Sequence, residues 1–574
     1  MKKRTLLAII SFIVTSILFY ACQSGSGSGT GQIASDTISI ALGKKIFEQN
    51  CSSCHSFRHD GIGPALSGVT SMASPDWLKH FIKDPVAVIQ SGDSRAKELL
   101  AKFHTMMPSF TTLADKDLDA IIAFLNTHKA GEKSSFVIDS NYLRDPIKTP
   151  IAMSDLVVGL EELTAIPHSG NEAIFNRIAK MDVQPNTNNI FVLDLNGKLY
   201  NVRNGKPVVY FDMPKLRPSF IPHPGLATGF GSFAFHPEFA KNGLLYTTHT
   251  ELPSAQRADF RFEDSIKSTV QWVVTEWKTD HPGQVPFSGK SRELFRVNMV
   301  TGIHGMQEIT FNPLAKPGQK DYGLLYIGIG DGGCAESGYP FLAHHLNRIW
   351  GTILRIDPRA NNSANGHYGI PDDNPFSKST DGSTLKEIYA YGFRNPHRIT
   401  WSQSGQMMAT NIGHGNIESL NFILPAHDYG WPIREGSYVI HTEGDMNKVY
   451  ALPANDSIYK ITYPVAEYDH GEGNAISGGY EYWGSAVPAL KGKYLFGDIS
   501  KARLFYVEMA DLKLGSQAPI KEWRISLNGK DITLSELCGR ERPDLRFGRD
   551  GKGEIYIFTK ADGKVYKLAT AAKL

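Results

Sequence analysis

The chain has 574 residues, of which 21% are charged, and its formal net charge is only +2. So small a charge over this length argues against a nucleic acid or another polyanion as partner. The 5 cysteines are too few for a disulfide-stabilised scaffold. The chain therefore has to be interpreted from its motifs, taken in order.

The first residues predict an export signal. Three basic residues at positions 2–4 precede an apolar run over residues 6–20. The run is too short to span a bilayer comfortably, which is typical of a cleavable signal peptide. We therefore expect an exported protein that faces the periplasm or the cell exterior.

The signal ends at Ala21-Cys22, and a Gly/Ser-rich tract follows it. A small residue before a cysteine resembles a bacterial lipoprotein processing site. This predicts a signal peptide over residues 1–21, lipidation of Cys22 and a flexible tether over residues 22–36 that anchors the protein to a membrane. The alternative is an ordinary signal peptide with an incidental cysteine.

Cys51, Cys54 and His55 form the pattern Cys-x-x-Cys-His, which is typical of covalent haem c attachment. The two thiols add to the haem vinyl groups, and the histidine becomes the proximal iron ligand. Alone, the motif also allows a redox dithiol or half of a zinc site. Its surroundings favour haem: the preceding helix carries an apolar face of Leu42, Ile46 and Phe47, and Gly43 leaves room for a crossing helix.

Met106-Met107-Pro108 supplies a thioether ahead of a second amphipathic helix, whose apolar stripe contains Leu118, Ile121, Ile122 and Leu125. The segment resembles the small class I c-type cytochromes, in which the methionine ligand directly precedes proline. The resemblance implies that Met107 is the second iron ligand and that the Pro64 carbonyl holds the His55 ring. Met106 is the alternative, one position away. We expect a small all-α cytochrome c domain over residues 37–130 with a His/Met haem c, a ligand pair that raises the haem potential.

A polar linker is predicted over residues 131–154, and the chain then changes character. Short aromatic and β-branched runs are broken by Gly, Asn, Asp and Pro. Runs over residues 191–195 and 198–202 flank Asn196-Gly197, which predicts a hairpin with a type I′ turn. Many short strands with almost no long amphipathic helix predict an all-β propeller over residues 155–572.

Blocks of this region resemble, in order, the soluble quinoprotein glucose and aldose sugar dehydrogenases. The blocks include Phe233-Ala234-Phe235-His236-Pro237, Gly328-Ile329-Gly330-Asp331-Gly332-Gly333, Tyr391-Gly392-Phe393-Arg394-Asn395-Pro396 and Asp428-Tyr429-Gly430-Trp431-Pro432. The resemblance implies a six-bladed propeller that holds pyrroloquinoline quinone (PQQ) and calcium at one end of its axis.

The resemblance implies catalytic roles for His304, Asp331 and Arg394. In this family a histidine removes the proton of the anomeric hydroxyl while hydride passes to the quinone. Asp331 matches the carboxylate that holds this base, and Arg394 matches the residue that stabilises negative charge on the quinone oxygen. Without the resemblance, His304 and Asp331 would be interpreted as ordinary turn residues.

Further matches imply the cofactor contacts. Arg394, Asn395, Lys501, Arg540 and Arg542 match PQQ ligands, and the last two are expected on one side of a strand. The backbone carbonyls of Gly413 and His414 match calcium ligands.

The chain departs from the family around its Gly-x-x-Gly block. Ala227-Thr228 stands where the family usually carries Gln or Glu, and Ser232 replaces a glycine. One polar contact to cofactor or substrate is thus lost or supplied elsewhere. Cys334 and Cys538 could pair in an oxidising compartment or stay as free thiols.

Together the two domains predict a quinohaemoprotein oxidoreductase. It would oxidise the C1 hydroxyl of an aldose to the lactone with PQQ, and pass electrons through its own haem to a downstream electron carrier. A sorbosone-like or non-sugar alcohol substrate stays open. The alternative is a non-catalytic propeller that binds a ligand or protein, with the haem as a redox sensor; the loss of Gln or Glu favours it, whereas His304, Asp331, Arg394 and Lys501 favour the enzyme.

Overall fold

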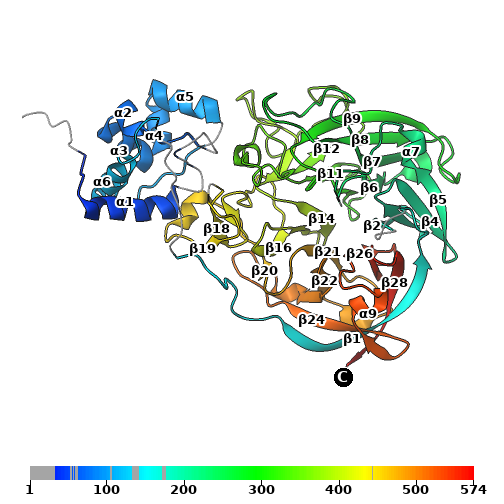
Figure 1. Cartoon of the computed structure of the whole chain (residues 1–574). Helices are drawn as coiled ribbons and strands as arrows, with labels where there is room; N and C mark the ends of the chain where they lie inside the picture. Colours follow the sequence, from blue (N-terminus) through cyan, green and yellow to red (C-terminus); the bar gives the residue numbers. More distant parts are fainter. Residues whose placement is uncertain are drawn as a thin grey trace, which may run out of the picture.

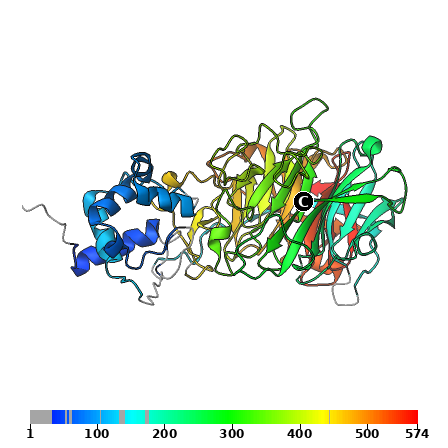
Figure 2. The same ribbon diagram turned by 90° about the horizontal axis from the view of Figure 1, so that it is seen from above.

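The computed structural model describes residues 33–51, 55, 57, 63–103, 106–131, 141–170, 176–225, 227–442 and 444–573. The predicted export signal, Cys22 and Cys54 lie outside these ranges. Within the ranges, no helix combines the length and apolar character needed to cross a membrane. The described part of the chain forms a helical domain beside a larger β domain (Figures 1 and 2).

The helical domain comprises α1 (Thr37–Asn50), α2 (Val69–Met72), α3 (Pro75–Lys83), α4 (Pro85–Gln90), α5 (Ser94–Phe103) and α6 (Asp115–Leu125). Its helices begin where capping residues satisfy exposed amides: Asp36 accepts from the Ser39 N–H at 2.8 Å, and Ser74 accepts from the Trp77 N–H at 3.2 Å. The predicted all-α architecture is therefore observed.

Helices α1 and α6 pack closely around Gly43. A Cβ at this position would lie 1.8 Å from the Ala120 carbonyl oxygen, so only glycine permits this crossing. The expected close approach is confirmed. Ile46 and Phe47 are buried as expected, but Leu42 is 39% exposed, because it lies outside the α1 stripe that meets α6.

The β domain contains four antiparallel sheets of four strands. They are β2 (Ile178–Val183), β3 (Ile190–Asp194), β4 (Lys198–Arg203) and β5 (Lys206–Asp212); β6 (Phe230–Phe235), β7 (Leu244–Glu251), β8 (Val270–Lys278) and β9 (Lys290–Met299); β10 (Glu308–Phe311), β11 (Leu325–Ile329), β12 (Thr352–Ile356) and β13 (Ile388–Tyr391); and β14 (Pro396–Trp401), β15 (Met407–Asn411), β16 (Ile417–Phe422) and β20 (Ala466–Asp469). The predicted large all-β domain is confirmed.

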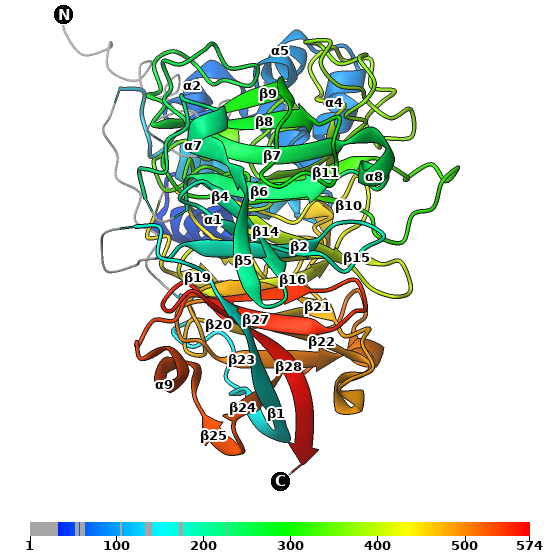
Figure 3. The same cartoon turned by 90° about the vertical axis from the view of Figure 1, so that its right-hand side faces the viewer.

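A larger sheet closes the domain (Figure 3). Its path is β21 (Ile476–Glu481), β22 (Lys493–Asp498), β23 (Leu504–Glu508), β24 (Lys521–Leu527), β1 (Ala152–Ala165), β28 (Lys564–Lys573), β27 (Ile555–Thr559) and β26 (Leu545–Arg549), and β25 (Lys530–Ile532) pairs with β24. Strand β1 pairs antiparallel with β28 and parallel with β24. The first and last strands of the domain are thereby joined.

Short helical turns connect the strands. They are α7 (Met213–Leu216), α8 (Phe239–Asn242), α9 (Leu534–Cys538), η1 (Pro340–Leu342), η2 (Asp456–Tyr459), η3 (Pro488–Leu490) and η4 (Met509–Asp511). Cys538 at the end of α9 and the buried Cys334 are free thiols, so the possible disulfide does not form.

The hairpin predicted around Gly197 forms, but its turn differs. Asp194 pairs with Lys198, which leaves three residues in the loop. A type I′ turn needs positive φ at both central residues, whereas here Gly197 alone has it, at 110°. The type I′ prediction is wrong, because that turn joins strands through two residues and this loop has three. The loop also packs against Pro214: a Cβ on Gly197 would lie 2.6 Å from the proline Cδ.

A small insert separates β16 from β20. It contains β17 (Arg434–Glu435), β18 (Tyr438–Ile440) and β19 (Val449–Tyr450), which form their own sheet, followed by η2. We call residues 434–463 the insert. It lies on the side of the β domain that faces the helical domain (Figure 1).

Candidate functional site

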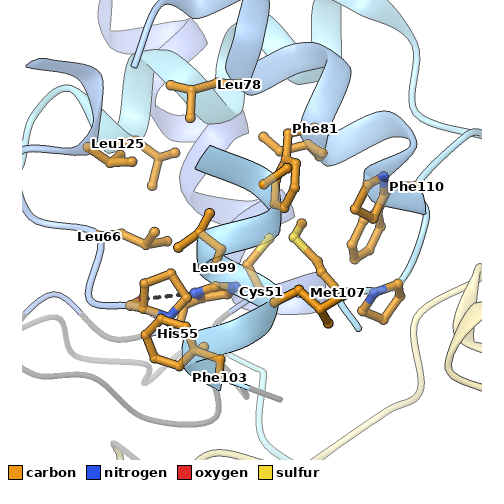
Figure 4. Close-up of a pocket in the computed structure, with 18 of the residues that line it drawn as sticks. Cys51, His55, Leu66, Leu78, Phe81, Leu99, Phe103, Met107, Phe110 and Leu125 are labelled. Carbon is orange, nitrogen blue, oxygen red and sulfur yellow. Dashed lines mark hydrogen bonds between the residues drawn. The ribbon is translucent and has the colours of Figure 1, made fainter. Parts of the chain in front are cut away.

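The helical domain encloses a cavity of about 380 Å³. Cys51, His55, Met106 and Met107 line it, and its remaining wall is largely apolar (Figure 4). The apolar lining includes Leu66, Leu78, Phe81, Leu99, Phe103, Phe110 and Leu125. A largely apolar cavity that also contains sulfur and imidazole donor atoms suits a haem.

His55 is prepared as an iron ligand. Its Nδ1–H donates to the Pro64 carbonyl at 2.9 Å, which confirms the expected contact and leaves Nε2 as the coordinating atom. Burial lowers the pKa of His55, so the imidazole is neutral as a ligand must be. Gly63 allows the ring to sit here, because a Cβ would lie 2.4 Å from His55 Cε1.

The two methionines differ in their surroundings. Met107 packs against the buried core of the domain, whereas Met106 is 44% exposed. A haem ligand in a dry pocket has to point inward, which favours Met107. The donor set therefore fits haem c: Cys51 would carry a thioether bond, and His55 and Met107 would hold the iron.

The β domain holds a second polar site, centred on His304 and Asp331. His304 lies on the loop before β10, and Asp331 follows β11. His304 Nδ1–H donates to Asp331 Oδ1 at 2.8 Å, because an ionised carboxylate can only accept. The structure thus brings together two residues that are distant in sequence, and it leaves Nε2 of His304 as a proton acceptor.

Several groups fix this pair in place. Asp331 is fully buried, and it also accepts from the Trp431 Nε1–H at 3.0 Å and the Gly333 N–H at 2.9 Å. His304 has φ 51°, a left-handed conformation that a histidine adopts only when its surroundings impose it. The Gly332 N–H holds it there by donating to the His304 carbonyl at 3.2 Å.

The surroundings of His304 favour its uncharged form. Burial lowers the pKa of His304, and the nearby Arg394 lowers it further, against the opposing effect of Asp331. A neutral imidazole near pH 7 is the form that can take a proton.

Arg394 itself is buried and lies over the Trp431 ring, 5.6 Å from its centroid. Its guanidinium donates to Glu336 and to the Gly413 carbonyl. His414 Nδ1 lies 3.1 Å from the same Glu336 oxygen. Although burial opposes ionisation, these partners hold the pKa of Glu336 well below its usual range. Glu336 was not predicted, since no motif marks a carboxylate that follows a Gly-Gly turn.

This arrangement bears on the expected calcium ligands. The Gly413 carbonyl accepts from Arg394, and the His414 N–H donates to Glu435 at 2.7 Å. Arg394, Glu336 and Glu435 thus surround the two predicted calcium ligands, and the mechanism proposed below uses no calcium ion.

The predicted cofactor contacts lie on different segments of the β domain. Asn395 is buried beside Arg394. Lys501 is exposed, and its Nζ donates to the Gly471 carbonyl at 2.9 Å. Arg540 and Arg542 are exposed in the loop between α9 and β26. Their placement on a strand is wrong, because Pro543 delays the start of β26 until Leu545.

Buried basic side chains that were not predicted lie near His304. Burial lowers the pKa of Lys560 to about 7 and that of Arg546 to about 10. The buried His397 has a pKa well below its usual value, from burial first and then from the charges of Arg546, Arg398 and Lys560, with His304 adding to it. An anionic ligand would relieve the electrostatic repulsion between Arg546, Arg398 and Lys560. The only signal in the sequence was that the arginine-rich segment continues to Arg546.

Ser232, one of the departures from the family, has a structural role. Its hydroxyl accepts from Lys180 Nζ at 3.2 Å, and Glu308 accepts from Lys180 at 2.6 Å and from Arg398. This buried network ties the first strands of four sheets together. Thr228 is also buried, and its hydroxyl donates to loop carbonyls and so does not face a ligand.

Comparisons with known proteins agree with this geometry. A family model described as Cytochrome c matches residues 40–129, and one described as Glucose / Sorbosone dehydrogenase matches residues 175–567. The HIPL1 protein of Arabidopsis thaliana is 27% identical over 390 residues, covering 60% of this chain and 53% of the relative. Quinoprotein glucose dehydrogenase B of Acinetobacter calcoaceticus is 25% identical over 247 residues, covering 40% of this chain and 45% of the relative.

A crystal structure of a glucose dehydrogenase superposes with a TM-score of 0.50 at 17% identity, covering 71% of this chain and 99% of that one. The chain spans about half the length of the curated relatives it matches. The match to the family model extends over most of the β domain and includes His304, Asp331 and Arg394. The chain therefore belongs to the Glucose / Sorbosone dehydrogenase family and carries an N-terminal cytochrome c domain.

Proposed function

We propose that this protein is a quinohaemoprotein dehydrogenase that oxidises the C1 hydroxyl of an aldose with PQQ and passes the electrons to its own haem c. The observation that carries the proposal is the buried, oriented His304–Asp331 pair beside the Arg394 guanidinium. A neutral base held by a carboxylate is the arrangement that proton abstraction from a hydroxyl requires. The haem pocket in the same chain gives the electrons a destination.

We infer that the β domain is a six-bladed propeller. The four separate sheets supply four blades, and the large sheet supplies two more, β21 to β24 and β26 to β28 with β1. The first strands β2, β6, β10, β14, β21 and β26 contact one another in this order, and β26 contacts β2. His304 and Arg394 both precede first strands, so in such a propeller they would lie at one end of the common axis.

PQQ carries three carboxylates, and the buried Arg546 and Lys560 suit such an anion, with the neutral His397 beside them. When bound, PQQ would supply the acceptor for the hydride from C1. His304 Nε2 would then take the hydroxyl proton, while Asp331 keeps Nδ1–H oriented and spreads the positive charge that develops on the ring. Arg394 would place a fixed positive charge where negative charge grows. The sugar would leave as the lactone, with its hydroxyl proton on His304 and its hydride transferred to PQQ.

The full-length protein, loaded with haem, tests the proposal by its visible spectrum under nitrogen. Oxidised protein is reconstituted with PQQ and calcium, and a panel of aldoses is added. Haem reduction that requires both sugar and PQQ supports the proposal. If PQQ binds but no sugar reduces the haem, the substrate class is wrong; if PQQ does not bind, the propeller is a recognition module.

Two further experiments test the cofactor assignment. Calcium is proposed at Gly413 and His414 from the family resemblance alone. Haem reduction that persists in the presence of a calcium chelator would contradict this assignment. Arg546→Ala is expected to weaken PQQ binding about tenfold or more, as loss of a buried charged partner does. Arg542→Ala is the matched comparison: a larger loss there would favour the exposed arginines predicted from the sequence.

We also propose export and membrane anchoring through Cys22. A Cys22→Ser variant should move from the membrane fraction to the soluble exported fraction. An unchanged distribution would show that the residue is incidental.

A further inference from the structure

The insert contacts the cytochrome domain at its haem pocket. Tyr459, at the end of η2, lines the cavity that contains Cys51, His55 and Met107. Its hydroxyl donates to the Asn50 carbonyl at 2.5 Å, one residue before Cys51. Its ring packs edge-on to Phe110, with 6.4 Å between the ring centroids. Among the described residues that line this cavity, Tyr459 alone comes from the β domain.

Arg434 holds the ring of Tyr459 in position. The Arg434 guanidinium stacks on the tyrosine ring, 4.5 Å from its centroid. Arg434 is 2% exposed, and its Nη2 donates to Asp456 at 2.7 Å within the same insert. Because Arg434 is buried and bound to Asp456, it restricts the movement of the Tyr459 ring. The contact between Tyr459 and the cytochrome domain is therefore well defined.

The same arginine lies one turn from the dehydrogenase site. The Arg434 N–H donates to the Gly430 carbonyl at 2.8 Å, closing a turn that contains Trp431. Trp431 donates to Asp331, which holds His304. A short, continuous series of bonds and ring contacts therefore runs from the base to the rim of the haem pocket.

The linker fixes the insert on its other side. Leu143 forms an antiparallel bridge with Val449 of β19, and the Tyr438 hydroxyl donates to the Pro146 carbonyl at 2.9 Å. The chain that leaves the cytochrome domain thus runs along the insert, which restrains both domains at this junction.

We propose that the insert docks the cytochrome domain and that Tyr459, positioned by Arg434, is the contact through which electrons reach the haem. The electron-transfer part rests on the proposed function. The two electrons taken from a sugar leave one at a time, each reducing haem iron from ferric to ferrous, and the accompanying protons pass to solvent. A downstream carrier restores ferric iron by taking each electron in turn.

The test compares Tyr459→Ala and Tyr459→Phe with wild type in the full-length, haem-loaded protein. Docking is measured without PQQ, by the hydrogen–deuterium exchange of peptides that cover residues 37–51 and 449–463. Tyr459→Ala should raise exchange in both peptides, and Tyr459→Phe, which keeps the ring, should raise it less. Tyr322→Ala removes another partly buried ring of the β domain and should leave both peptides unchanged.

Electron transfer is read by stopped flow with PQQ and an aldose. Tyr459→Ala should slow haem reduction about tenfold, the effect of losing a central interface aromatic on the docked fraction. Reduction of a small artificial dye should be unchanged. Unaltered exchange and unaltered haem reduction in Tyr459→Ala would overturn the proposal. If no sugar reduces wild-type protein, the proposed function fails, and the exchange experiment still decides whether Tyr459 docks the domain.

Discussion

Replacing Asp331 with asparagine tests the central geometry of the site. The carboxylate is fully buried and accepts hydrogen bonds from His304, Trp431 and Gly333. Asparagine keeps the shape but has one accepting oxygen and one donating nitrogen. If the nitrogen faces His304, the imidazole proton is forced onto Nε2, where it blocks proton abstraction; if it faces Trp431, two donors meet in a buried site.

The expected loss follows from these contacts. A hydrogen bond to a charged group contributes about 1.5–3 kcal/mol, which alone corresponds to a rate effect of about 10- to 150-fold. The unfavourable tautomer adds to this, so we expect sugar oxidation to slow about 10²- to 10⁴-fold, with haem content unchanged.

The pH dependence gives an independent check. His304 has a lowered pKa and acts as a base when neutral, so activity should fall as the pH drops through that pKa. Asp331 raises this pKa, and its removal should therefore move the acid limb of kcat/KM to lower pH. The assay is steady-state dye reduction across pH, with the exposed Asp372→Asn as control. Wild-type kcat in Asp331→Asn, or an acid limb at higher pH, would refute the reasoning.

Three further outcomes test other parts of the molecule. Met107→Ala should lower the haem midpoint potential in a potentiometric titration, whereas Met106→Ala should not; the reverse result would exchange the ligands. Gly43→Ala should destabilise the cytochrome domain by about 1–3 kcal/mol in thermal unfolding, since its Cβ would overlap α6, while Lys45→Ala on the exposed face should have little effect. Glu308→Gln should cost about 3–5 kcal/mol in denaturant unfolding, because it removes the carboxylate that pairs with two buried cations, and an unchanged midpoint would contradict this.

Features encoded by neighbouring residues could be predicted from the sequence. The Cys51 motif, the two apolar helix stripes and the hairpin around Gly197 depend on spacing along the chain, which the sequence displays directly. The all-α and all-β domains follow from the same periodicities. The pairing of His304 with Asp331 could be predicted only from the family resemblance, because no local sequence pattern links residues at the ends of two different strands.

Tertiary structure decided which charges face the site and where the domains meet. Arg542 and Arg546 are equally basic in sequence, yet the loop exposes the first and β26 buries the second. Glu336 and Tyr459 carry no motif; each gains its role from partners brought to it by other segments, Arg394 for one and Arg434 for the other. The physical reason is that burial and electrostatic coupling depend on how the sheets close and what the domains cover, which is a property of the whole fold.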